Sequence, residues 1–115
     1  IRELIEYFKI DSGDVIVFHD DLDINFGKIK TKFGGSSAGH HGIESIDKFI
    51  GKDYSRVRIG IGHPEEKIEI DNHVLQDFND DEKEELSSIT KNITDSISIL
   101  LDKKLDLFSS TVNNK

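Results

Sequence analysis

Residues 15–33 read VIVFHDDLDINFGKIKTKF and contain the two strand patterns that decide the fold. The opening VIVF is a continuous apolar run rich in β-branched side chains, which is typical of a strand buried on both faces. It ends in HDDLD, residues 19–23. In open α/β sheets, ligands and catalytic groups collect at the carboxyl ends of strands, so this polar segment is a candidate site.

Two further stretches, GKIKTKF at 27–33 and SRVRIGIG at 55–62, alternate polar and apolar residues and are predicted to be strands. Alternation gives each strand one basic face: Lys28, Lys30 and Lys32 on the first, Arg56 and Arg58 on the second. Such a surface is suited to a phosphate backbone, although a row of lysines also serves to guard a sheet edge.

Helical periodicity is found in three stretches: 1–9, 42–49 and 79–105. The last is predicted to be one long amphipathic helix, with Asn79 or Asp80 as its N-cap and an acidic first turn. Residues 72–78 fit a short helix or a bend, and residues 109–115 are predicted to be a frayed tail. Together the patterns predict a single α/β domain over residues 1–115.

Composition indicates a globular protein, with 35% hydrophobic and 33% charged residues in 115. The sequence contains neither cysteine nor an apolar run long enough to span a bilayer, and no signal peptide is visible, which favours the cytoplasm. Net charge is −8, but residues 26–62 carry seven basic and three acidic side chains. An anionic ligand is therefore expected there, between two acidic segments.

The HDDLD segment has three interpretations. A carboxylate there would orient a histidine from elsewhere and stabilise its cation. Alternatively, His19, Asp20 and Asp23 with His40 and His41 would hold a metal, or the segment is a solvated acidic turn.

The loop GGSSAGHHG, residues 34–42, precedes a predicted helix. Glycines before a helix let backbone N–H groups turn toward an anion, although a flexible connection would have the same composition. The loop fits neither the dinucleotide-binding fingerprint nor the P-loop.

The order of these motifs resembles that of the bacterial peptidyl-tRNA hydrolases. In that family a strand ending in His-Asp-Asp/Glu-Leu-Asp is followed by a Gly-Lys strand, a loop ending in Gly-His-Asn-Gly and a strand with Arg-Ile-Gly-Ile-Gly-x-Pro. Residues 15–64 carry HDDLD, GK, GHHG and RIGIGHP in that order. The flanking ELIEYFKI and HVLQDFNDDEKEEL also resemble the family, so the resemblance covers nearly the whole chain.

The resemblance implies hydrolysis of the ester between a peptide and the 3′ ribose of tRNA, without metal or cofactor. It implies a twisted mixed β-sheet flanked by helices, and we expect a monomer. By the same resemblance Asp20 matches the aspartate that holds the catalytic histidine in its basic form. His40 matches the loop histidine, and His41 stands where the family has an asparagine that contacts the tRNA end. Three basic residues match positions that bind tRNA phosphates: Lys30, Lys32 and Arg58.

Two features depart from the family pattern. The N-terminal strands and the segment with the catalytic histidine have no counterpart here, so we expect a C-terminal part of the domain that is inactive alone. Position 41 is histidine, which cannot reproduce both hydrogen bonds of an amide. A peptidyl-tRNA hydrolase and a non-catalytic tRNA-binding remnant or subunit both remain open.

Overall fold

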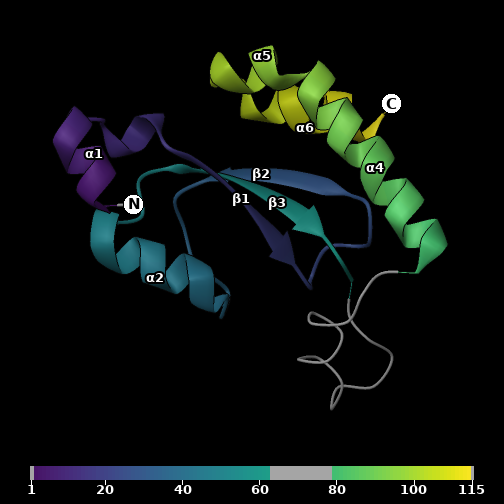
Figure 1. The fold of residues 1–115 in the computed structure, drawn as a ribbon, viewed down its shortest axis with the longest axis horizontal. Coiled ribbons are helices and arrows are strands. Elements are labelled where there is room, and N and C mark those ends of the chain that lie inside the picture. Colours follow the sequence, from purple (N-terminus) through teal and green to yellow (C-terminus); the bar gives the residue numbers. More distant parts are fainter. Residues whose placement is uncertain (1, 63–78, 115) are drawn as a thin grey trace.

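The computed structural model describes residues 2–62 and 79–114 and contains one mixed sheet with helices packed around it (Figure 1). The strands are β1 (Ile16–Asp21), β2 (Ile29–Phe33) and β3 (Ser55–Gly60). The helices are α1 (Arg2–Phe8), the short 3-10 helix η1 (Ser12–Asp14), α2 (His41–Ile50), α4 (Asp80–Asp95), α5 (Ile97–Leu101) and α6 (Leu105–Asn113). The predicted strands and the first two predicted helices are confirmed. The prediction for residues 72–78 lies outside the described residues.

β3 is the central strand of the sheet, whose order is β1-β3-β2. It runs parallel to β1 and antiparallel to β2. The prediction that the first strand is buried on both faces is wrong for the described part of the chain. Phe18 in its middle is 42% exposed, and its other residues are only partly buried. Along its outer edge, β1 has no partner among the described strands.

The two faces of the sheet have different covers. Because side chains alternate along a strand, Val57 of β3 faces one side while its neighbour Arg56 faces the other. Helices α4, α5 and α6 lie over the Val57 face, and α2 lies on the opposite side (Figure 1).

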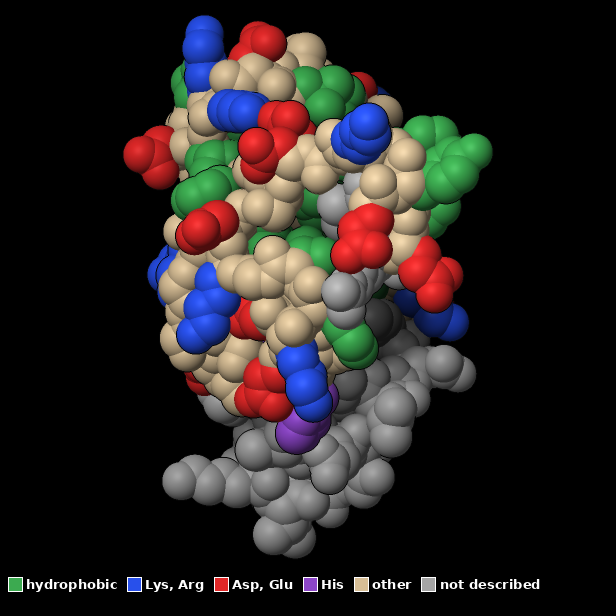
Figure 2. All heavy atoms as spheres, turned by 90° about the vertical axis from the view of Figure 1, so that its left-hand side faces the viewer, with side chains coloured by type: hydrophobic (Ala, Val, Ile, Leu, Met, Phe, Trp, Pro, Cys, Tyr) green, Lys and Arg blue, Asp and Glu red, His purple; other side chains and the backbone are tan. Residues whose placement is uncertain are grey.

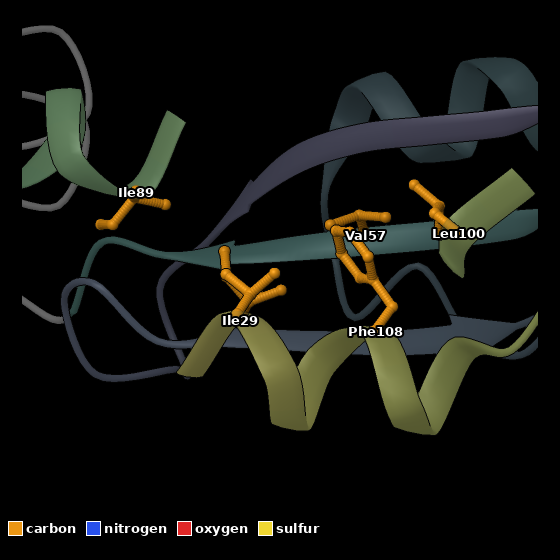
Figure 3. Close-up of a cluster of buried hydrophobic side chains, with 6 residues drawn as sticks. Ile29, Val57, Ile89, Leu100 and Phe108 are labelled. Carbon is orange, nitrogen blue, oxygen red and sulfur yellow. The ribbon is translucent and has the colours of Figure 1, made fainter. Parts of the chain in front are cut away.

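The core lies between the sheet and the C-terminal helices. Six buried side chains form it: Ile29, Val57, Ile89, Leu100, Phe108 and Val112. Figure 3 shows Phe108 from α6 and Leu100 from α5 meeting Val57 of the central strand. The core therefore joins segments from both halves of the chain.

The helix predicted over residues 79–105 is instead broken into α4 and α5, and α6 begins at its last residue. Asn79 is the N-cap of α4, as predicted, with a capping box to Glu82. The helix ends before Ser96, and a second break at residues 102–104 turns the chain back toward β2. These breaks bring Leu100 and Phe108 into the core, and packing of this kind overrides helical periodicity.

The predicted frayed tail is also wrong. Residues 105–113 form α6, in which Phe108 and Val112 are buried. The side chain of Asn113 holds both backbone groups of Ile29: it accepts from the N–H at 2.8 Å and donates to the carbonyl at 2.7 Å. No helix in the described residues is long and apolar enough to cross a membrane.

Candidate functional site

The end of β1 and the loop between β2 and α2 enclose a cavity of about 220 Å³. Its lining residues are His19, Asp20, Asp21, Leu22, Asp23, Ser37, Ala38, Gly39 and His40. The strand-end segment and the glycine-rich loop, two separate candidates in the sequence, thus form one site.

Asp20 and His40 are joined directly in this cavity. His40 Nε2 lies 2.8 Å from Asp20 Oδ1. His40 is also the N-cap of α2, and its Nδ1 accepts from the backbone N–H of Ile43 at 3.2 Å. Since a backbone N–H only donates, Nδ1 carries no proton and the Nε2–H donates to the carboxylate. Both ring nitrogens of His40 are therefore engaged.

His19 has the opposite arrangement. Its Nδ1 lies 2.8 Å from the backbone carbonyl oxygen of Asp20, which only accepts, so Nδ1 carries the proton. Its Nε2 is buried without a hydrogen-bond partner in the described structure. The ring stands edge-on to that of His40, with centroids 5.0 Å apart. Burial lowers the pKa of His19, and the nearby His40 lowers it further.

A second, smaller cavity of about 50 Å³ adjoins the first and carries the basic residues. It shares four lining residues with the larger cavity: His19, Asp21, Ser37 and Ala38. Lys32 and Arg58 line it, and Arg58 Nε donates to Asp21 Oδ2 at 2.9 Å. That bond engages one edge of the guanidinium.

The other two lysines predicted to share the basic face, Lys30 and Lys28, lie in different places. Lys30 is exposed and pairs across the sheet with Arg58. Lys28 precedes β2 and lines a separate cavity against α4, so it does not belong to the lysine face as predicted.

Arg56 does not share an exposed basic face with Arg58, because its side chain is buried and only 1% of the residue is exposed. It bonds instead to Asp47 of α2 and to carbonyls of the glycine-rich loop. Sequence analysis missed this contact, because alternation alone does not tell a solvent-facing arginine from one covered by a helix.

His41 is the first residue of α2 and does not line either cavity. Its side chain is 97% exposed, with Nδ1 3.7 Å from Glu44 Oε2. His40 and His41 are thus adjacent in sequence but differ completely in environment.

The metal-binding interpretation gains no support from this geometry. Across residues 2–62 and 79–114, no group of three or more histidine and acidic side chains is arranged to hold a metal ion. Asp20 and His40 bond to each other instead.

Comparisons of the sequence and of the structure with known proteins point to the same family. The family described as Peptidyl-tRNA hydrolase matches residues 1–115. A peptidyl-tRNA hydrolase of Pelagibacter ubique is 76% identical over the whole chain, which covers 62% of that protein, and one of Aliarcobacter butzleri is 46% identical over 92% of the chain. The crystal structure of an Arg119Gln mutant of the Acinetobacter baumannii enzyme superposes with a TM-score of 0.87 at 28% identity, covering 98% of this chain and 58% of that one. The chain therefore spans about 60% of the length of these relatives.

Proposed function

We propose that this chain, which belongs to the peptidyl-tRNA hydrolase family, contributes the tRNA-binding surface and the orienting carboxylate of a site that hydrolyses the ester bond of peptidyl-tRNA. The observation that carries the proposal is the continuity of the two cavities. The Asp20–His40 pair lies in one, Lys32 and Arg58 line the other, and the two share four residues. An ester and a nearby phosphate of one RNA end would fit this arrangement.

Ester hydrolysis by water needs a general base, and neither histidine of the cavity is free to act as one. A base needs a lone pair within reach of the attacking water. Both nitrogens of His40 are engaged, and the free nitrogen of His19 is buried. We therefore infer that the base comes from outside the described residues, with Asp20 stabilising its cation through the carboxylate oxygen that His40 leaves free.

The outer edge of β1 offers a place for such a segment. β1 is unpaired on that side among the described strands, and several large apolar side chains nearby in the sequence are exposed: Leu4, Tyr7, Phe8, Ile10 and Phe18. Apolar side chains are also visible between charged ones on the face that carries α1 and α2 (Figure 2). We infer that a further strand pairs here and brings the base toward Asp20.

The basic residues would bind the tRNA itself. Lys32 and Arg58 line the smaller cavity, which would receive a phosphate, and Lys30 is an exposed residue of the same strand as Lys32. The glycine-rich loop, with His40 at its end and His41 just beyond, would line the path of the acceptor end. We expect a monomer that acts in the cytoplasm without metal or cofactor.

The test is to join residues 1–115 to the part of the Pelagibacter relative that lies outside the match. The chimera is expected to hydrolyse peptidyl-tRNA and to keep its activity in chelator. Residues 1–115 alone are expected to bind tRNA without turnover. Turnover by the isolated chain would contradict the inferred origin of the base.

The alternative function is tRNA binding without hydrolysis, which the absence of a usable base among the described residues favours. An inactive chimera that still binds tRNA would decide for it. A chimera that neither binds nor hydrolyses would exclude both functions.

A further inference from the structure

The side chain of Arg56 forms a buried junction between three segments of the fold. Its Nη1 donates to the backbone carbonyls of Gly35 and Ser36, at 3.1 and 3.0 Å. Its Nη2 donates to Asp47 Oδ1 of α2 at 2.9 Å. The side chains of Arg56 and Asp47 are only 2% and 9% exposed. Arg56 also lines the smaller cavity, but its guanidinium is paired with Asp47 and its side chain is almost fully buried, so we infer that it does not reach a phosphate.

Tyr54 completes the junction from the residue before β3. Its hydroxyl donates to the same Asp47 oxygen at 2.6 Å, and the Arg56 guanidinium lies 4.9 Å from its ring centroid. The aromatic ring and the carboxylate hold the guanidinium in one plane and one direction, toward the loop. Tyr54 itself makes no side-chain bond to the loop carbonyls that Arg56 holds.

The loop depends on this contact because its own backbone is unusual. Gly34, Gly35 and Gly39 have positive φ angles of 69°, 90° and 80°, and Ala38 has 50°. Such a segment has many accessible conformations when it is not fixed. It is tied at its start by Gly34 N–H to the Tyr54 carbonyl and at its end by the His40 side chain. Between these ends, Arg56 holds the Gly35 and Ser36 carbonyls from the buried side, and the Ser37 hydroxyl makes a longer, exposed bond of 3.5 Å to Glu44 Oε1 of α2.

We propose that Arg56 is a positioning residue: it fixes the glycine-rich loop so that His40 reaches Asp20, and it does not contact RNA. The consequence for tRNA rests on the proposed function, whereas the consequence for the loop does not. Lysine at this position would keep the charge but offers one compact ammonium in place of a planar fork, so it cannot hold Asp47 and both carbonyls together.

The experiment compares three proteins: unmodified residues 1–115, Arg56→Lys, and Tyr54→Phe as the matched control. Tyr54→Phe removes the hydroxyl that bonds to Asp47 and makes no change to the bonds between Arg56 and the loop. In Arg56→Lys, the loop amides of Ala38 and His40 should exchange with deuterium about tenfold faster, relative to the amides of β3. The ring nitrogen signals of His40 should shift toward a mixture of tautomers. Tyr54→Phe should change neither readout. Unchanged loop exchange in Arg56→Lys, or an equal change in Tyr54→Phe, would overturn the proposal.

Two further measurements separate positioning from other roles. In the unmodified chain, a guanidinium held at both Nη atoms should rotate slowly and give separate Hη resonances in the NMR spectrum. A single averaged signal would overturn the positioning role of Arg56, and this measurement does not depend on whether Arg56→Lys folds. Binding to tRNA should weaken in Arg56→Lys with an unchanged salt slope, because no phosphate contact is lost. A shallower slope would make Arg56 a phosphate ligand and overturn the proposal. A loosened loop with undiminished tRNA binding would support the positioning role of Arg56. It would contradict the proposal that the loop lines the path of the tRNA acceptor end.

Discussion

Replacing Asn113 by alanine removes two of the hydrogen bonds between α6 and β2, while the bond from the Thr31 hydroxyl to the Leu105 carbonyl remains. The Asn113 amide acts as a neighbouring strand would, accepting from the Ile29 N–H at 2.8 Å and donating to the Ile29 carbonyl at 2.7 Å. Ile29 is fully buried, so its two backbone groups would lose their partners in a place that water reaches poorly. At about 1–2 kcal/mol for each unsatisfied group, the free energy of unfolding should fall by about 2–4 kcal/mol.

The assay is urea unfolding followed by circular dichroism, with Asn114→Ala as the control. Asn114 also makes a side-chain bond, from Nδ2 to the Ser110 carbonyl at 2.7 Å, but this bond is exposed and within its own helix region. Its loss should therefore cost less than about 1 kcal/mol. Equal losses in the two variants would refute the reasoning, because the helix would then not be fixed to β2 through Asn113.

Four other predictions concern the site. Lys30→Ala and Lys32→Ala should each weaken tRNA binding and reduce its salt slope by about one unit, and an affinity loss at constant slope would indicate an effect through folding. In the chimera, Asp20→Asn should cut the rate by about tenfold or more while tRNA affinity persists, since an amide stabilises a histidine cation less well, and an unchanged rate would contradict this role. His41→Asn should raise kcat/KM by a factor worth about 1 kcal/mol, whereas a clear fall would mean that the histidine is itself adapted to the substrate. Burial lowers the pKa of His19, so below about pH 6.5 the unfolded chain binds a proton more readily than the folded chain does. The free energy of unfolding should therefore fall as the pH falls. In urea titrations, His19→Gln should lose this part of the pH dependence.

Local patterns predicted the strands and the capping of α4 because those features depend on neighbouring residues. Alternation around Lys30 and Arg58 is visible in the sequence, as is Asn79 before an acidic turn. The position of the loop relative to the end of β1 came only from the structure, since spacing alone does not bring Asp20 to His40.

The errors share one physical cause, which is contact between residues far apart in the sequence. Arg56 has the same local pattern as Arg58 and lines the same small cavity, yet only Arg56 is held beneath α2 by Asp47, with 2% of its side chain exposed against 26% for Arg58. Ser96 interrupts a regular apolar period because the chain must turn for Leu100 to reach the sheet. Tertiary packing of this kind leaves no trace in a window of ten or fifteen residues.

The bond between Ile29 and Asn113 spans 84 residues of sequence, and it sets an order of events during synthesis. At about 5–20 residues per second, a ribosome needs roughly 4–17 s to proceed from the first of these residues to the second. During that interval β2 has been made but its covering helix has not. The apolar side of the nascent sheet is thus open to chaperones, and to other nascent chains, until the last turn of α6 emerges.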